Sequence, residues 1–181
     1  MNETVYIVNG ARTPMGGLQG CFSSISAVEL GSAAIEETLN RSCIEKKEVQ
    51  EVIMGCVLPG GLRQGPARQA AIQAGIPVET GASTINKLCG SGMKATMLAF
   101  DSIKAGSNRL VIAGGMESMS NAPYLLPKAR QGLRMGHGEI QDSMFTDGLE
   151  DASSARLMGS FAQEVADEYQ LTRESMDEFA I

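Results

Sequence analysis

The stretch Ile85-Asn-Lys-Leu-Cys-Gly-Ser-Gly-Met93 joins a run of β-forming residues to a helix whose start is rich in glycine. It places one cysteine, Cys89, at the junction. A helix N-terminus stabilises a thiolate, because its first backbone N–H groups are unpaired and its dipole is positive there. Gly90 and Gly92 lack a Cβ atom, so a substrate could approach the backbone closely. The stretch therefore predicts a nucleophilic thiol beside N–H groups that could bind an oxyanion.

Spacing alone leaves a second interpretation of Cys89 open, because most free cysteines are small buried hydrophobic residues. The other three cysteines, Cys21, Cys43 and Cys56, lack a glycine-flanked helix start, and packing is the expected role of each. No Cys-x-x-Cys pair occurs and the chain has one histidine, so no metal site is expected. In a cytosolic chain all four thiols would be reduced.

Strand-like and helix-like segments alternate on both sides of this stretch. A capping box at Ser26-Ala-Val-Glu29 opens the first expected helix, Pro66 and Gly75 frame the second, and residues 93–104 form the third. The third helix is apolar nearly all round and is expected to be buried. The expected strands are residues 5–8, 51–54, 82–88 and 109–113. The order βαβαβαβ predicts an α/β fold with a mostly parallel sheet.

Beyond Gly114 the pattern changes to a long stretch rich in Gly, Met, Pro and Ser, without sustained periodicity until about residue 153. An irregular insert of this size is usually functional. Helical patterning then returns, and Thr172 with Glu174 predicts the start of a last helix.

Composition indicates a globular protein, since 43% of residues are hydrophobic, 20% are charged, and no apolar run could span a bilayer. A net charge of −6 argues against nucleic acid or an anionic membrane as the main partner. The first residues lack the basic and apolar regions of a signal peptide, so a cytoplasmic location is expected.

Several longer motifs, in this order, resemble those of the thiolase family, and the later ones are similar to acetyl-CoA acetyltransferases in particular. They are Val8-Asn-Gly-Ala-Arg-Thr-Pro14, Asn86-Lys-Leu-Cys-Gly-Ser-Gly92, Ala113-Gly-Gly-Met-Glu-Ser-Met-Ser-Asn-Ala-Pro123, Arg134-Met-Gly-His-Gly-Glu139, Asp142-Ser-Met144 and Thr146-Asp-Gly-Leu-Glu-Asp-Ala152. Thiolases are roughly twice as long as these 181 residues, so the resemblance covers an N-terminal half.

The resemblance implies a layered αβαβα body whose buried central helix carries the nucleophile at its start. Residues 1–118 would form an incomplete N-terminal core domain, and residues 119–181 the beginning of an irregular loop domain, with the C-terminal domain absent. Residues 124–142 would be the segment through which homodimers join into homotetramers.

The resemblance also implies an acyltransferase that condenses two acetyl-CoA molecules to acetoacetyl-CoA and coenzyme A, or runs the reverse thiolysis. Cys89 would carry the acyl group, and no cofactor is expected because the coenzyme A thioester is the substrate. Leu149 would enclose the pantetheine arm and Met158 would line the acyl pocket, although ordinary packing is the alternative for both. Many acetoacetyl-forming thiolases have histidine at the position of Leu157, so the acyl chain length stays open.

Four polar residues of the irregular stretch invite other roles. Lys128, Arg130 and Arg134 could bind phosphates, but their match to the family's assembly segment favours a solvated or subunit-contacting surface. His137 could be a general base, but the family's catalytic histidine lies in a Gly-His-Pro motif that this chain lacks. The family's second cysteine, its histidine and an asparagine-held water all belong to the C-terminal half, so these residues alone are expected to be inactive.

Two competing hypotheses remain at this point. One is a truncated, inactive thiolase-like protein that acts only as a subunit or fragment. The other is a ketosynthase-like condensing enzyme, which also uses a cysteine at a buried helix but accepts acyl carriers. The encoded chain length tests the first hypothesis, and acyl transfer from a carrier protein rather than from coenzyme A tests the second.

Overall fold

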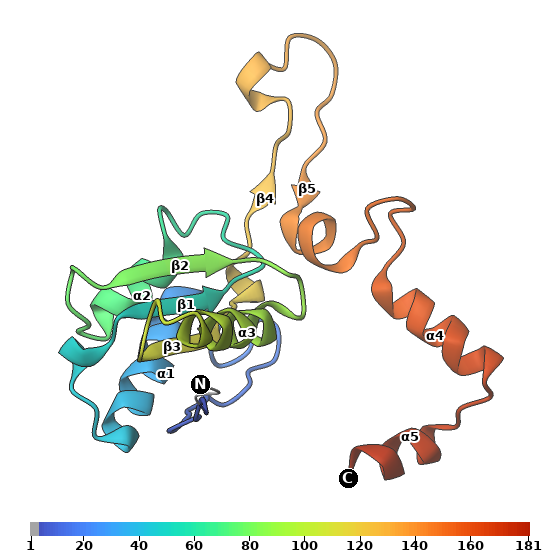
Figure 1. The fold of residues 1–181 in the computed structure, drawn as a ribbon. Coiled ribbons are helices and arrows are strands. Elements are labelled where there is room, and N and C mark those ends of the chain that lie inside the picture. Colours follow the sequence, from blue (N-terminus) through green and yellow to red (C-terminus); the bar gives the residue numbers. More distant parts are fainter. Residues whose placement is uncertain (1–3) are drawn as a thin grey trace. The chain divides into compact units, whose positions relative to one another are not determined.

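The computed structural model describes residues 4–181. The chain divides into two compact units, Met1–Pro123 and Tyr124–Ile181, which are described separately (Figure 1). The sequence predicts this boundary between residues 118 and 119, five residues earlier in the chain.

The first unit is built on a parallel sheet of three strands. They are β1 (Glu51–Gly55), β2 (Gly81–Ile85) and β3 (Val111–Gly115), in the order β2-β1-β3. The register places Gly55 opposite both Ile85 and Gly115, so the carboxyl ends of all three strands meet at one edge of the sheet. The predicted parallel sheet is confirmed.

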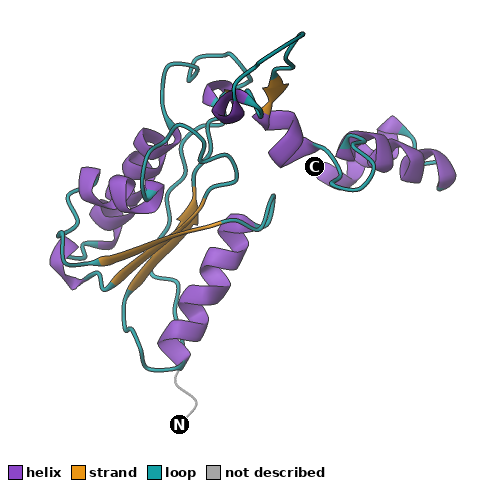
Figure 2. Ribbon diagram, turned by 90° about the horizontal axis from the view of Figure 1, so that it is seen from above, coloured by secondary structure: helices purple, strands orange, loops and turns teal. Residues whose placement is uncertain are grey.

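One face of the sheet is covered by α1 (Ala27–Ser42) and α2 (Pro66–Gln73) (Figure 2). The predicted capping box opens α1: the Glu29 amide donates to the Ser26 hydroxyl, and the Ser26 amide donates to the Glu29 carboxylate. α2 begins at Pro66, and the chain turns away at Gly75, whose φ is +80°. A short 3-10 helix, Lys46–Glu48, precedes β1.

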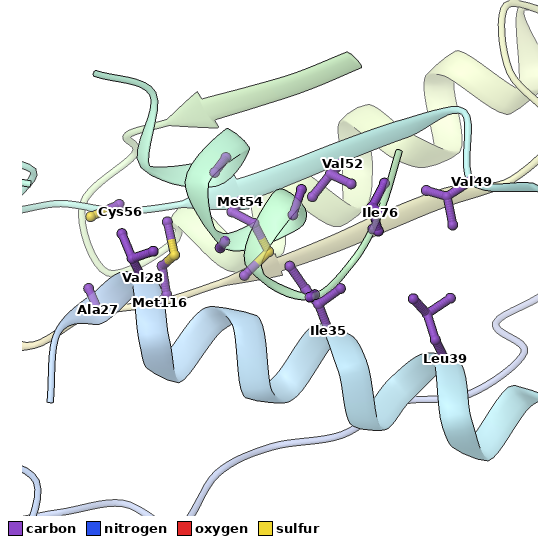
Figure 3. Close-up of a cluster of buried hydrophobic side chains, with 14 residues drawn as sticks. Ala27, Val28, Ile35, Leu39, Val49, Val52, Met54, Cys56, Ile76 and Met116 are labelled. Atoms are coloured by element: carbon purple, nitrogen blue, oxygen red, sulfur yellow. The ribbon is translucent and has the colours of Figure 1, made fainter. Parts of the chain in front are cut away.

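The main apolar core lies between this face and the two helices (Figure 3). Alternate residues of β1 point into it, as the twofold repeat of a strand requires. Its buried members are Ala27, Val28, Ile35, Leu39, Val49, Val52, Met54, Cys56, Ala67, Ala70, Ala71, Ala74, Ile76 and Met116.

The opposite face of the sheet carries α3 (Ser91–Lys104). Its sheet side is buried through Ala95 and Ala99, but its other side exposes Met93, Met97 and Phe100, which are 68%, 48% and 47% exposed. The predicted burial of this helix is therefore wrong for the chain described between residues 4 and 181. An apolar helix is buried all round only where a second layer covers it.

Residues 5–8, which the sequence predicts as a buried strand, form no strand, and Tyr6, Ile7 and Val8 are 77%, 87% and 61% exposed. The predicted strand is therefore wrong. Residues 5–8 line an apolar hollow of about 640 Å³ together with residues of α1, α3 and β3. An apolar run becomes a strand only when a neighbour supplies its hydrogen-bond ladder, and among the described residues β3 ends the sheet on one side and β2 on the other.

The second unit begins with an antiparallel pair, β4 (Tyr124–Leu125) and β5 (Gln141–Asp142). A π-helix (Phe145–Leu149), α4 (Met158–Glu168) and α5 (Arg173–Ala180) follow. Thr172 caps α5 as predicted, accepting the Ser175 amide at 3.1 Å. Two short 3-10 helices, Met119–Asn121 and Ala129–Gln131, lie in the first and second unit respectively. Within residues 4–181, no helix has the length and apolar character needed to cross a membrane.

Candidate active site

Cys89 lies in the turn that joins β2 to α3, at the edge where the carboxyl ends of the strands meet. The strand stops at Ile85 and the helix starts at Ser91, so the predicted strand to residue 88 is three residues too long. The Cys89 residue is exposed. Leu88, directly before it, has a φ of +48°, a left-handed conformation that costs a side-chain-bearing residue roughly 1 kcal/mol or more. The surrounding structure must hold such a turn in place.

Two polar side chains hold this turn. The Asn86 side chain accepts the Leu88 amide at 2.9 Å through Oδ1 and donates to the Val57 carbonyl at 3.2 Å through Nδ2. The Ser91 hydroxyl, in a residue that is 5% exposed, accepts the Lys87 amide at 2.8 Å and donates to the Leu88 carbonyl at 2.6 Å. The backbone on the N-terminal side of Cys89 is therefore fixed before any substrate arrives.

Gly55 lets the first turn of α3 lie directly on the sheet. A Cβ atom on Gly55 would stand 2.5 Å from Ser91 Cβ and 2.9 Å from the Gly92 nitrogen. A Cβ atom on Gly92 would face the backbone of Gly114 at 3.7 Å. This is an ordinary contact distance, so the packing requires glycine at Gly55 but not at Gly92, and the close approach of substrate over Gly90 and Gly92 stays a prediction.

Asn86 and Ser91 belong to the Asn86–Gly92 motif, but the sequence pattern predicts no role for either of them, nor for Gly55. Asn86 offered a signal, since asparagine commonly bonds a backbone amide two residues further on in turns. The glycine at the end of β1 offered a weaker one, because glycine inside a strand often marks close backbone approach.

The other cysteines differ sharply in environment. Cys56 is 1% exposed, and burial, reinforced by the nearby Glu117 carboxylate, raises the pKa of its thiol to about 12. It packs in the core as predicted. Cys21 and Cys43 are exposed, so their expected packing role is wrong. Both lie in or next to turns, where a side chain can point to solvent without breaking the core.

Leu149 and Met158 lie in the second unit. Leu149 ends the π-helix and is half-buried, whereas Met158 starts α4 and is 48% exposed. Glu150 and Leu157 form an antiparallel bridge, and the Asp151 amide donates to the Arg156 carbonyl at 2.8 Å. The two candidate substrate residues therefore flank one closed loop, next to its paired ends.

The basic residues also lie in this unit, within the excursion between β4 and β5. Lys128, Arg130, Arg134 and His137 are all exposed. None of the four forms an ion pair with another residue of the described chain, 4–181. His137 is flanked by glycines, and Gly136 has a φ of +81°.

Comparison with known proteins gives consistent matches over this whole architecture. The family model described as "Thiolase, N-terminal domain" matches residues 5–181. Acetyl-CoA acetyltransferase of Cupriavidus necator is 50% identical over 98% of the chain and 45% of its own length. Acetyl-CoA acetyltransferase 2 of Arabidopsis thaliana is 51% identical over 98% of the chain and 44% of its own length.

A solved structure matches as well. The Acat5 thiolase from Ascaris suum in complex with coenzyme A superposes with a TM-score of 0.89 at 38% identity, covering 97% of this chain and 45% of that one. The chain thus spans somewhat less than half the length of the proteins it matches.

Proposed function

Because the chain belongs to the thiolase family over residues 5–181, we propose that the protein is an acyltransferase that condenses two acetyl-CoA molecules to acetoacetyl-CoA and coenzyme A, or catalyses the reverse thiolysis. The expected family resemblance and fold class are confirmed, and family membership favours a thiolase over a ketosynthase-like enzyme. The carrying observation is an exposed Cys89 on a fixed turn before α3, in a chain about half identical to acetyl-CoA acetyltransferases.

In the first step the Cys89 thiolate attacks the carbonyl carbon of acetyl-CoA. The tetrahedral oxyanion collapses, the bond from carbon to the coenzyme A sulfur breaks, and coenzyme A leaves as a thiolate that takes up one proton. In the second step another acetyl-CoA gives one proton from its methyl carbon to a base, which balances the proton taken up by coenzyme A, and that carbon attacks the acetyl-Cys89 thioester. The cysteine leaves as a thiolate, so the two steps form a ping-pong cycle.

This chain supplies the nucleophile and the scaffold that holds it. We assign Leu149 to the pantetheine arm and Met158 to the acyl pocket, with coenzyme A entering as substrate and without a metal. The closed loop between Glu150 and Leu157 supports this pairing, because it keeps the two residues at adjacent ends. The apolar Leu157 leaves the acyl chain length to be measured.

Mapping the acetylated residue tests the function directly. Each of the four cysteines lies on a different tryptic peptide, so acetyl transfer can be assigned without ambiguity. Incubation of the full-length protein with acetyl-CoA should place one acetyl group on Cys89 and release coenzyme A in equal amount, which an acid quench and a brief tryptic digestion near neutral pH then reveal on the Cys89 peptide. The exposed Cys21 and Cys43 are internal controls for non-specific acetylation. Equal acetylation of Cys21, Cys43 and Cys89 contradicts the proposal, and so does the absence of acetylation at Cys89.

We further propose that the excursion between β4 and β5 joins copies of the protein into a homodimer or homotetramer. Three apolar side chains there, Leu133, Met135 and Ile140, are 47%, 98% and 69% exposed. Together with the unpaired basic residues of this excursion, they are typical of a subunit contact.

The double substitution Lys128→Ala and Arg130→Ala should therefore reduce the oligomer size measured by light scattering after size-exclusion chromatography. The KM for acetyl-CoA should stay within about twofold, because rim charges tune association more than they bind ligand. Lys47→Ala removes another exposed lysine and serves as the control. A raised KM with an unchanged oligomer would instead favour phosphate binding by these residues.

A further inference from the structure

The Glu117 carboxylate stands where the carboxyl ends of the strands meet, and the reaction steps above do not use it. It follows β3 and is half-buried. The next turn along that edge is residues 56–58, directly after β1, and the carboxylate binds this turn. It accepts the Val57 amide at 2.7 Å and the Leu58 amide at 3.2 Å, and the Cys56 thiol lies 3.6 Å away. Hydrogen bonds to a charged acceptor are the strong ones in proteins.

The turn that Glu117 holds leads straight to the nucleophile. The Val57 carbonyl accepts the Asn86 side-chain amide at 3.2 Å, and the other end of that side chain accepts the Leu88 amide at 2.9 Å. Leu88 carries the left-handed φ of +48° and precedes Cys89. The Leu58 amide, which binds Glu117, and the Val57 carbonyl, which binds Asn86, belong to the same peptide unit. Hydrogen bonds and this one peptide unit therefore connect the Glu117 carboxylate to Leu88, the residue before the thiol.

We propose that Glu117 is a positioning residue for Cys89, acting through the Val57 peptide and the Asn86 side chain. The backbone around the strand ends supports this route: the Met116 amide donates to the Gly55 carbonyl at 2.9 Å, and the Cys56 amide donates to the Ile85 carbonyl at 3.0 Å. Glu117 thus follows β3, while its carboxylate fixes the turn that follows the neighbouring strand β1. Without it, Asn86 keeps its own bond to Leu88 but loses a fixed partner at Val57.

The four cysteines provide the measurement. Alkylation by iodoacetamide, followed on the separate tryptic peptides, gives a rate for each thiol in one sample of the full-length protein. Cys21 and Cys43 are exposed and report the intrinsic reagent rate, whereas Cys56 is 1% exposed and becomes reactive only if the core opens. This readout needs no substrate.

Glu117→Gln keeps the size of the side chain but removes its charge and replaces one acceptor oxygen by a donor. It should slow alkylation of Cys89 about three- to tenfold relative to Cys21, because the displaced thiol loses its place before the helix N-terminus. The kcat should fall about 10- to 100-fold with little change in KM, as expected for a misplaced reacting group. Glu79→Gln, at an exposed glutamate of the same unit, should change neither.

The proposed route through Asn86 predicts a second result. Asn86→Ala should give the same phenotype, and the double variant should be no slower than Asn86→Ala alone to within about twofold, because both substitutions break one pathway. A Glu117→Gln protein with wild-type Cys89 alkylation and kcat overturns the proposal, even if it melts earlier. Effects that multiply in the double variant overturn the route through Asn86.

If Glu117→Gln makes Cys56 reactive, the substitution has opened the core, and the Asn86→Ala protein then provides the test. Slower alkylation of Cys89 in that protein, with Cys56 still protected, supports the route through Asn86. Alkylation of Cys89 at the wild-type rate overturns it. The assignment rests on the proposed role of Cys89 as nucleophile. If the wild-type protein fails to become acetylated, the proposed function fails, while the alkylation rates still decide whether Glu117 positions this thiol.

Discussion

Replacing Cys89 by alanine should abolish acetyl transfer while leaving the fold intact. The side chain is exposed, so its removal leaves no cavity. Its sulfur is the only atom of the chain proposed to form a covalent bond with substrate, and loss of a covalent nucleophile lowers kcat by on the order of 10⁵- to 10⁶-fold. Release of coenzyme A from acetyl-CoA, followed with a thiol reagent after protein removal, measures the effect.

Cys21→Ala is the matched control, because it removes another exposed thiol from the same unit. It should retain wild-type turnover, and both variants should unfold at the wild-type temperature. Turnover by the Cys89→Ala protein within about tenfold of wild type would exclude acyl-cysteine catalysis, since no residual mechanism of that efficiency is expected once the nucleophile is gone.

Replacing Gly55 by alanine should destabilise the protein by about 3 kcal/mol, near the upper end of the cost of overpacking. The new methyl group would stand 2.5 Å from Ser91 Cβ, 2.7 Å from the Ser91 carbonyl carbon and 2.9 Å from the Gly92 nitrogen. These are mostly backbone atoms at the start of α3, so no side-chain rotation relieves the clash. The midpoint of thermal unfolding should fall by roughly 6–12 °C.

The same clash pushes on the turn that carries the nucleophile. Because Ser91 holds both the Lys87 amide and the Leu88 carbonyl, a shift of α3 should also lower kcat by about 10- to 100-fold in molecules that remain folded. Gly17→Ala is the control, since a Cβ atom there meets no other atom within 4 Å. If Gly55→Ala unfolds at the same temperature as Gly17→Ala, the proposed close packing of α3 on β1 is wrong.

Local signals predicted most of the first unit. The capping box at Ser26, the Pro66 and Gly75 punctuation and the apolar runs located α1, α2, β1 and β3 to within a few residues, because each depends on its own sequence. The predictions of a strand at residues 5–8 and of a buried α3 were wrong because neither property depends on the local sequence alone. Both need a neighbouring element, and an apolar pattern alone does not say whether that neighbour is present.

The candidate site was predictable at Cys89 and less so around it. A cysteine before a glycine-rich helix start carries a recognisable chemical signal. Val57 and Glu117 lie at the site only because the carboxyl ends of the parallel strands meet there. Val57 is 29 residues from its partner Asn86, and Glu117 is 60 residues from its partner Val57. Such contacts are set by the register of the sheet, which the sequence pattern does not specify.

The side-chain bonds around residues 86–91 have a dynamic consequence. The segment is a loop by sequence and by exposure, yet the Lys87 and Leu88 amides both bond to side chains. We expect their hydrogen exchange to be slow, and the backbone order parameter at Cys89 to be about 0.85, the value of a rigid scaffold. The thiol is then presented to solvent with the small thermal amplitude of a strand, and its ordering entropy is lost once, during folding, rather than in every turnover.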